Sequence, residues 1–251
     1  MATVIALDIG GTNTRIARVN NGIISHYIKL KTPHTKGTFL FLLKNEIRKL
    51  ITPDIHAIAV AIAGPLKDGI IKNPPNLPLK NFNLKKYLSD LFHKRVEVEN
   101  DAHCVALAEL QYGCKKKNFV VIIFGTGVGG GVVINGKLYT GEGYASELGH
   151  MIIHQGKDME YWWKLQRRKN IHYKLKQQAL THVGEGIGSV INIFDPEIVI
   201  LTGGIRKNGT PYLNELRKKA YGSVLLPKKT PIIFSRLAHP GILGAGLLVR
   251  N

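Results

Sequence analysis

A short segment near the N-terminus combines a carboxylate, two glycines and several hydrogen-bond donors. It reads Asp8-Ile9-Gly10-Gly11-Thr12-Asn13-Thr14-Arg15. Gly10 and Gly11 permit a sharp turn whose N–H groups can face an anion. Polar or cationic side chains follow at Thr12, Asn13 and Arg15. Asp8 would repel phosphate, but its carboxylate suits a Mg²⁺ ion that bridges to phosphate, often through water. The segment predicts a phosphate and magnesium site; the alternative is a tight hairpin that needs glycine only for its turn.

A second glycine-rich segment repeats this pattern without an acidic residue. It reads Gly125-Thr126-Gly127-Val128-Gly129-Gly130-Gly131. Five glycines exceed what a hairpin turn needs, which indicates close approach of the backbone to a ligand. We therefore favour phosphate contact at Gly125, Thr126 and Gly127 over a plain turn. Neither segment is a P-loop or a GxGxxG turn that opens a helix.

Asn100 and Asp101 lie where a predicted strand meets a predicted helix. Asn is a good helix N-cap, and Asp is favourable in the first helical turn, so capping alone explains both residues. A carboxylate at this position could also accept the proton of a substrate hydroxyl, as in kinases that use a carboxylate base. The two roles are compatible, and both stay open here.

Small residues surround Glu147 and His150 in the stretch from Gly141 to His150. A carboxylate and an imidazole beside small residues predict a polar pocket wall suited to vicinal sugar hydroxyls. A metal site of His150, His154 and Asp158 on one helix is the weaker alternative, because glycines interrupt this stretch. Farther along, Thr202-Gly203-Gly204 ends a strand; it could approach a nucleotide base or ribose, or it could be a simple turn.

The elements that would position these residues form two similar series. The first half predicts strands at 3–9, 15–19, 23–30, 56–63 and 95–98 and helices at 38–50, 84–92 and 100–112. The second half predicts strands at 119–124, 131–134, 137–140, 198–201 and 231–235 and helices within 159–193, 211–221 and 241–249. This order indicates a duplicated α/β unit with ligands at the carboxyl ends of the strands, and a boundary near 100–117.

The composition places the chain among folded proteins. Its 251 residues are 44% hydrophobic and 21% charged, enough for one large domain or two modest ones. The two cysteines form no CxxC pair, so a cysteine-based zinc site is not expected. No bilayer-length apolar run and no signal peptide are recognisable, and we expect a cytoplasmic protein without a membrane partner.

The formal net charge of +18 raises the question of a polyanionic partner. Its basic residues form short scattered clusters without an RNA-recognition, zinc-finger or KH signature. We favour a solvated, lysine-rich surface over specific binding of nucleic acid. A phosphate-rich substrate remains a third interpretation.

The motifs together resemble the ROK family of sugar kinases and related regulators, within the actin, Hsp70 and hexokinase superfamily. The matching segments are Asp8-Ile9-Gly10-Gly11-Thr12, Gly125-Thr126-Gly127-Val128-Gly129, Leu201-Thr202-Gly203-Gly204 and Pro240-Gly241-Ile242-Leu243-Gly244-Ala245. The resemblance implies two ribonuclease H-like (actin-type ATPase) α/β domains with an interdomain cleft. The small domain would be 1–104, rejoined by the C-terminal helix 240–251, and the large domain 105–239.

The resemblance also implies the roles of particular residues. Asp101 would be the catalytic base, and ATP with Mg²⁺ would be the cofactors, the Mg²⁺ held by Asp8. The sugar contacts would come from Asn100, Asp101, Glu147, His150, Glu160, Gly64 and Asn76. The ATP and phosphate contacts would come from Asp8, Gly10, Gly11, Thr12, Asn13, Arg15, Gly125, Thr126, Gly127, Gly203 and Gly204.

One region departs from the family pattern. Most members bind a structural zinc through cysteines that follow the Glu-x-Gly-His motif, whereas this chain has Gly156-Lys157-Asp158-Met159 there. Zinc is therefore not expected. Polyphosphate-using glucokinases of the family are similarly short and also lack these cysteines.

The resulting prediction is an ATP-dependent hexose kinase of carbohydrate metabolism and glycolysis that phosphorylates glucose at O6 and forms a homodimer. The alternatives are a polyphosphate-dependent glucokinase and a kinase of N-acetylhexosamines or fructose. A sugar-sensing regulator is less favoured, because Asp8 leaves no room before it for a helix-turn-helix. A protein that binds nucleic acid through its charge is the remaining alternative.

Overall fold

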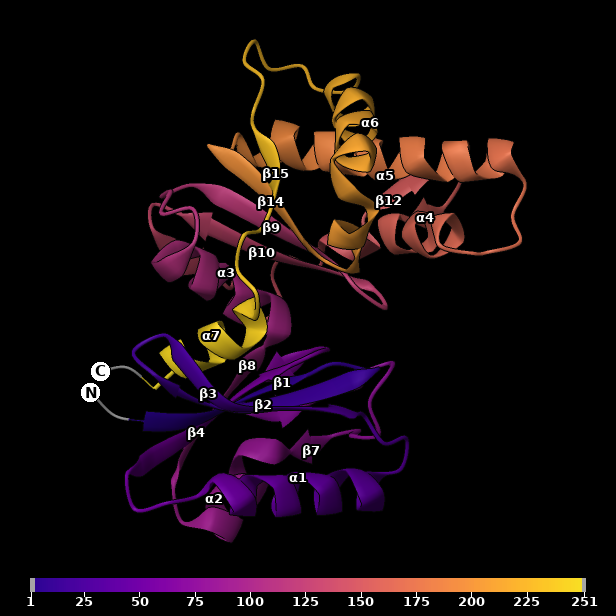
Figure 1. The fold of residues 1–251 in the computed structure, drawn as a ribbon. Helices are drawn as coiled ribbons and strands as arrows, with labels where there is room; N and C mark the ends of the chain where they lie inside the picture. The colour runs from indigo at the N-terminus through magenta and orange to yellow at the C-terminus, as the bar shows by residue number, and fades with distance from the viewer. Residues whose placement is uncertain (1–2, 250–251) are drawn as a thin grey trace. The chain divides into compact units, whose positions relative to one another are not determined.

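The computed structural model describes residues 3–249, which divide into two compact units (Figure 1). Unit 1 holds the described residues up to Cys114, Gly141–Tyr144, and those from Leu237 onward. Unit 2 holds Lys115–Thr140 and Ala145–Arg236. The domains expected at 1–104 with 240–251, and at 105–239, stay a prediction; residues 1, 2, 250 and 251 of the first lie outside the described residues.

The sheet of unit 1 has five strands in the order β3-β2-β1-β4-β8. These are β1 (Thr3–Ile9), β2 (Asn13–Asn20), β3 (Ile23–Lys31), β4 (Ile55–Ile62) and β8 (Arg95–Asn100). β1, β2 and β3 form an antiparallel meander, whereas β1, β4 and β8 are parallel. β2 and β3, predicted as strands at 15–19 and 23–30, are joined by a hairpin turn at Asn21 and Gly22, and both residues have the positive φ that a tight two-residue turn requires.

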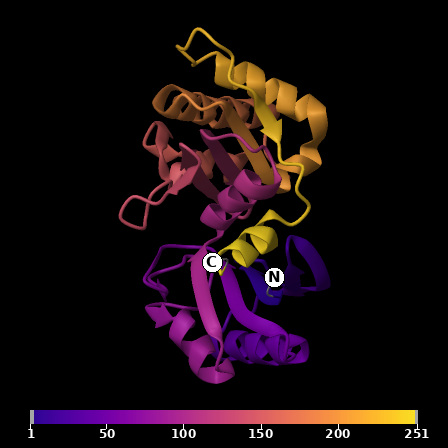
Figure 2. The same cartoon turned by 90° about the vertical axis from the view of Figure 1, so that its left-hand side faces the viewer.

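Helices cover both faces of this sheet, as Figure 1 and the turned view in Figure 2 show. α1 (Lys36–Leu50) and α2 (Leu84–Phe92) pack on the face that carries the large side chains Ile5, Leu7 and Ile9. α3 (Asp101–Tyr112) and α7 (Pro240–Leu247) pack on the other face. The short strands β5 (Leu66–Lys67), β6 (Ile70–Ile71) and β7 (Phe82–Asn83) form a separate small sheet.

Small side chains bring α3 and α7 close to the sheet and to each other. β4 presents Ala57, Ala59 and Ala61 to this side. A Cβ at Gly244 of α7 would overlap the carbonyl oxygen of Cys104 in α3. The close approach therefore depends on alanine and glycine rather than on bulky core residues.

The sheet of unit 2 repeats the topology of unit 1 in the order β11-β10-β9-β14-β15. Its strands are β9 (Phe119–Phe124), β10 (Val128–Ile134), β11 (Lys137–Tyr139), β14 (Ile198–Gly203) and β15 (Ile232–Phe234). Its core joins this sheet to α4 (Met159–Gln166), α5 (Tyr173–Phe194) and α6 (Gly209–Tyr221). The remaining elements are the 3₁₀ turns η1 (Leu148–His150) and η2 (Gly204–Asn208) and the hairpin of β12 (Ile152–His154) and β13 (Lys157–Asp158). The predicted α/β duplication is thus confirmed at the level of strand order.

The region predicted as mostly helical between 159 and 193 contains the two helices α4 and α5. α4 ends at Gln166, and the basic run Arg167-Arg168-Lys169 follows it. Positive side chains there interact favourably with the negative end of the helix dipole. His172 then caps α5 by accepting a hydrogen bond from the backbone N–H of Lys174. None of the helices within residues 3–249 has the length and hydropathy that crossing a lipid bilayer requires.

Candidate functional site

Three loops of unit 1 leave the sheet at the same edge. Ile9, the last residue of β1, pairs with Ile62 of β4, and Ile62 pairs with Asn100 of β8. Because these strands are parallel, the segments that follow all begin at their carboxyl ends. Those segments start at Gly10, Ala63 and Asp101 and contain most of the unit 1 residues predicted to bind ligand.

The first glycine turn is held by its own backbone and by Thr32. Gly10 N–H donates to the carbonyl of Asn13 at 3.0 Å, so this N–H is engaged within the turn. The Thr32 hydroxyl donates to the Gly10 carbonyl at 2.6 Å, and Thr32 N–H donates to the Thr12 carbonyl at 3.2 Å. Thr32 was not among the predicted residues, because it follows β3 and only strand pairing brings it to the turn.

Gly11 lies directly against Asn76. A Cβ at Gly11 would overlap the side chain of Asn76. Gly64 has a φ of 110° and packs against Pro74, which lies in the same proline-rich loop as Asn76. The structure therefore brings the predicted phosphate turn and both loop residues, Gly64 and Asn76, to one edge of unit 1.

Asp8 is a half-buried carboxylate paired with a cation. Arg15, its partner in the β1–β2 ladder, donates from Nη1 to Asp8 Oδ2 at 2.9 Å. Burial raises the pKa of the Asp8 carboxyl above its usual range, although Arg15 and His239 oppose this shift. Gly241, in the first turn of α7, leaves space for the carboxylate, since a Cβ there would contact it.

Mg²⁺ fits this position as a hydrated ion rather than as one caged by protein. Within residues 3–249 no group of three or more His, Cys, Asp or Glu side chains is placed to hold a metal. A single carboxylate suits Mg²⁺, which keeps most of its water and completes its shell with substrate phosphates. Because Arg15 binds Oδ2, Oδ1 is the oxygen that Asp8 would offer.

Asn100 and Asp101 begin α3 as predicted. Asn100 Oδ1 accepts from the N–H groups of Ala102 and His103, at 2.8 and 3.2 Å. Its Nδ2 lies 3.4 Å from the carbonyl oxygen of Gly64, which links the ends of β4 and β8. Asp101 Oδ1 accepts from Ala102 N–H at 2.9 Å. The capping role is therefore observed, while the role of Asp101 as a base stays a prediction.

Glu99 supports this helix start from the strand side. Its Oε1 accepts from Asn100 N–H at 2.7 Å and lies 3.1 Å from Nδ1 of the buried His103. Burial alone would raise the pKa of Glu99, but the hydrogen bonds with His103 and Asn100 outweigh it, so the net pKa is lowered. An ionised Glu99 thus fixes the backbone at Asn100.

The second glycine turn, in unit 2, is held by α4. The carbonyl of Gly125 accepts from Trp163 Nε1 at 3.0 Å and from Arg167 Nη1 at 2.7 Å. Glu160 Oε2 accepts from the N–H of Val128 at 2.8 Å. Glu160, predicted as a sugar contact, therefore also supports the turn predicted to hold phosphate.

Two of the five glycines in this segment, Gly127 and Gly130, have a packing reason. A Cβ at Gly127 would overlap the Glu160 carboxylate, and one at Gly130 would overlap Leu148. A Cβ at Gly149, in η1, would overlap the carbonyl of Val128. These glycines let α4 and η1 lie directly on β10, which neither a plain hairpin nor a phosphate turn alone would require.

Glu147 directly precedes η1 and His150 is its last residue, and both side chains are exposed. His150 N–H donates to the carbonyl of Glu147 at 3.0 Å, which closes the turn between them. His150 Nδ1 lies 3.1 Å from Asp158 Oδ2. His154 does not join them, because it stacks on His182 at a centroid distance of 4.4 Å. The three-residue metal site weighed from the sequence is therefore not assembled.

Gly203 is the last residue of β14 and Gly204 follows it, at the same edge of the sheet as Gly125. Gly203 pairs with Phe124 in the parallel ladder and has a φ of 85°. A Cβ at Gly203 would overlap the Phe124 carbonyl. The carboxyl ends of β9 and β14 thus place the two predicted nucleotide-binding turns of unit 2 beside each other.

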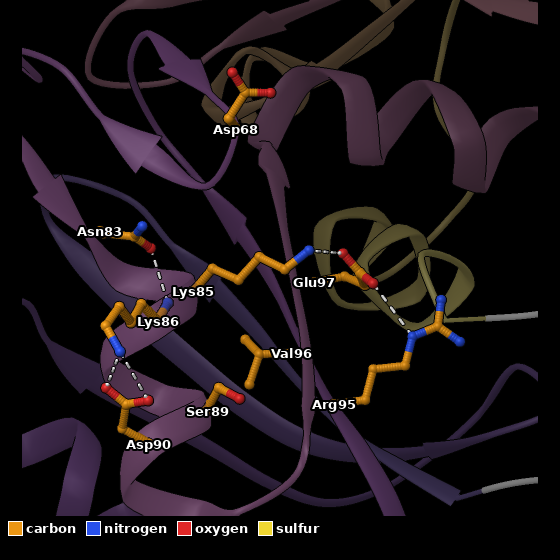
Figure 3. A pocket seen from close by; sticks show the side chains of 9 residues that line it. All are labelled: Asp68, Asn83, Lys85, Lys86, Ser89, Asp90, Arg95, Val96 and Glu97. Atoms are coloured by element: carbon orange, nitrogen blue, oxygen red, sulfur yellow. Dashed lines mark hydrogen bonds and ion pairs between the residues drawn. The ribbon is translucent and has the colours of Figure 1, made fainter.

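A surface hollow of about 500 Å³ at α2 and β8 contains none of the predicted residues (Figure 3). Its cations are already paired: Lys85 with Glu97 at 2.8 Å, Lys86 with Asp90 at 2.9 Å, and Arg95 with Glu97 at 3.2 Å. Three cations and three carboxylates line it, so it offers no excess positive charge to a phosphate. The lining residues are Asp68, Asn83, Lys85, Lys86, Ser89, Asp90, Arg95, Val96 and Glu97.

Zinc does not fit the region after Glu147-x-x-His150. The two cysteines, Cys104 and Cys114, belong to unit 1, whereas this segment belongs to unit 2. Asp158 instead occupies the Nδ1 side of His150. Asp158 was considered from the sequence only as a metal ligand, and Trp163 and Arg167 were not predicted as site residues.

A protein-family model and known relatives match this chain. The ROK family model matches residues 4–170. A glucokinase of Thermotoga maritima is 25% identical, with 99% of this chain and 97% of that protein aligned. An N-acetylmannosamine kinase of Haemophilus influenzae is 36% identical over a shorter alignment, 59% of this chain and 52% of that protein.

The fold also matches a solved structure. A ROK family glucokinase from Streptomyces griseus, in complex with glucose and AMPPNP, superposes with a TM-score of 0.84 at 22% identity. The alignment covers 98% of this chain and 99% of that one. This likeness confirms the predicted class of two ribonuclease H-like, actin-type α/β units.

Proposed function

This chain belongs to the ROK family, and on that premise we propose that it is a sugar kinase that transfers the γ-phosphoryl group of ATP to the O6 hydroxyl of glucose. The observation that carries the proposal is the register of β1, β4 and β8 in unit 1. It places the Gly10–Gly11 turn, the loop after Gly64 and the start of α3 at one edge. A phosphate turn and a candidate base beside hydroxyl-binding loops suit phosphoryl transfer to an alcohol.

Asp101 is the proposed base. The sugar hydroxyl oxygen attacks the γ-phosphorus, the bond to the β,γ-bridging oxygen breaks, and ADP leaves. The hydroxyl proton passes to the Asp101 carboxylate. Asp101 lies in the first turn of α3, where the positive end of the helix dipole interacts favourably with a carboxylate.

Phosphate binding is assigned to the two glycine turns and to Arg15, with Gly203 and Gly204 on the adenosine side. A bound Mg²⁺ would supply charge neutralisation on the phosphates, and Asp8 is the residue that would hold it. The sugar contacts are assigned to Asn100, Asp101, Glu147, His150, Glu160, Gly64 and Asn76. We also propose a cytoplasmic homodimer acting in glycolysis.

The sugar and the donor each have a second candidate. N-acetylmannosamine is the second sugar, because the kinase of Haemophilus influenzae is more similar where it aligns. Polyphosphate is the second donor, because a chain of net charge +18 attracts polyanions. A coupled assay of hexoses and N-acetylhexosamines against ATP and against polyphosphate separates these cases; glucose with ATP is expected to be fastest.

The base assignment has its own test. Asp101→Asn is expected to lower kcat by about 10²–10⁴-fold while glucose still binds. Asp90→Asn is the matched control, because Asp90 is an exposed carboxylate of unit 1 that pairs only with Lys86 in the contacts above. Near-normal turnover of Asp101→Asn would show that the base is another group.

The non-enzymatic alternatives give different results. A sugar-sensing regulator would shift a DNA fragment in a gel and phosphorylate no sugar. A charge-driven nucleic-acid binder would bind any polyanion with steep salt dependence. Either result, with no phosphoryl transfer in the sugar panel, would replace the kinase proposal.

A further inference from the structure

We propose that Asp158 is a positioning residue that holds His150 and Glu160 in the orientation in which they contact the sugar. The inference rests on the proposed sugar-kinase function. It concerns unit 2 alone and depends on one carboxylate whose two oxygens serve two different partners.

The first partner is His150. Asp158 Oδ2 lies 3.1 Å from His150 Nδ1, and the imidazole side chain is 60% exposed. An exposed imidazole without such a partner would sample several rotamers. A carboxylate oxygen accepts hydrogen bonds, so this contact favours the imidazole tautomer whose proton is on Nδ1. In that tautomer Nε2 is an acceptor for a sugar hydroxyl.

The second partner is the start of α4. Asp158 Oδ1 accepts from Tyr161 N–H at 2.7 Å, which makes Asp158 the N-cap of this helix. Glu160 lies in the capped first turn, and its Oε2 accepts from Val128 N–H at 2.8 Å. The cap therefore sets the position of Glu160 as well as that of the glycine turn it supports.

A tight hairpin brings Asp158 to His150 without help from a metal. β12 and β13 pair in antiparallel register, with Ile152 opposite Asp158. The turn at Gln155 and Gly156 has φ values of 48° and 68°, as a two-residue hairpin turn requires. This turn places Asp158 beside the imidazole of His150, which lies eight residues earlier in the chain.

Two variants separate the two contacts. Asp158→Ser keeps a hydroxyl that can cap Tyr161 N–H but is too short to reach His150. Asp158→Ala removes both contacts. Asp90→Ser, an exposed carboxylate of α2, is the control.

With the sugar identified in the substrate screen, Asp158→Ser is expected to raise the hexose KM about fivefold to tenfold. The KM for ATP and the Tm are expected to stay at wild-type values. Asp158→Ala is expected to show a larger rise in hexose KM together with a lower Tm, because it also removes the cap that positions Glu160. Asp90→Ser is expected to match the wild type in both KM values.

Imidazole ¹⁵N NMR, with His150 assigned by comparison with His150→Gln, gives a readout that needs no turnover. The Nδ1-protonated form is expected in the wild type and a mixture of tautomers in Asp158→Ser. If Asp158→Ser keeps both the wild-type hexose KM and the wild-type tautomer, Asp158 is only a helix cap and the inference is wrong. If the tautomer changes in Asp158→Ser but the wild type phosphorylates no sugar, the interaction that orients His150 is supported and the kinase proposal fails.

Discussion

Two adjacent tryptophans of α4 offer a direct test of how the second glycine turn is held. Trp162 and Trp163 are both buried, with exposed fractions of 4% and 2%. Trp163 Nε1 donates to the Gly125 carbonyl at 3.0 Å. Trp162 Nε1 is buried without a hydrogen-bond partner in the part of the chain that the structure describes. Phenylalanine at either position removes the same atoms, so the difference between the variants reports on the hydrogen bond.

The expected difference follows from these contacts. Trp163→Phe loses one net hydrogen bond, about 1 kcal/mol, and no more, because Arg167 still donates to the Gly125 carbonyl. Trp162→Phe removes an unpaired buried N–H, whose desolvation costs about 1–3 kcal/mol. The loss of ring volume is common to both variants and cancels. Trp163→Phe is therefore expected to be less stable than Trp162→Phe by about 2 kcal/mol or more.

Urea unfolding measures this difference. The chain contains two tryptophans, so each variant keeps one fluorescence reporter within α4, and circular dichroism provides a second probe. Enzyme kinetics supply the functional arm. Trp163→Phe is expected to raise the KM for the nucleotide because the Gly125 turn loses a support, whereas Trp162→Phe is expected to leave it unchanged.

Equal free energies of unfolding for the two variants would refute the reasoning. So would a larger loss in Trp162→Phe, since its Nε1–H would then have to contribute stability. If the stabilities differ as expected but both variants keep the same nucleotide KM, α4 supports the fold of unit 2 and does not position the glycine turn for a ligand.

Two further predictions concern titratable groups of unit 1. In the native protein a thiol reagent is expected to modify the half-buried Cys114 and to reach Cys104 only after unfolding, because burial removes access and raises the pKa of Cys104 well above its usual value; two thiols reacting at one rate would contradict this. Burial already raises the pKa of Asp8 and Arg15 opposes that shift, so Arg15→Gln is expected to raise the pKa further. If Asp8 must be ionised to hold Mg²⁺, the acid limb of kcat/KM then moves to higher pH, and an unmoved limb in a pH–rate profile would exclude Asp8 from that role.

Local chemistry made several elements predictable from the sequence. Asn21 and Gly22 are suited to positive φ, and a hairpin forms at that turn. Asn100 is a good N-cap, and α3 begins directly after it. Apolar runs marked the central strands because parallel strands are covered on both faces. Each of these signals acts over a few neighbouring residues, so it can be recognised without knowing the fold.

The contacts that assemble the candidate site depend on residues far apart in the chain. Gly11 meets Asn76, Trp163 reaches Gly125, and Thr32 binds the turn at Gly10 only after strands and helices have packed. The catalytic and binding roles themselves stay predictions.

The sequence by itself determined the α/β class and the duplicated order of elements, because periodicity, caps and turn residues are local properties. Its glycine-rich motifs also carried the resemblance to the ROK family. The tertiary structure decided which strand ends are aligned, why Gly127 and Gly130 of the second turn have no side chain, and that the Asp158 carboxylate lies beside His150. Those outcomes follow from sheet register and close packing, which bring together segments far apart in the chain. No local sequence pattern indicates that such segments are in contact.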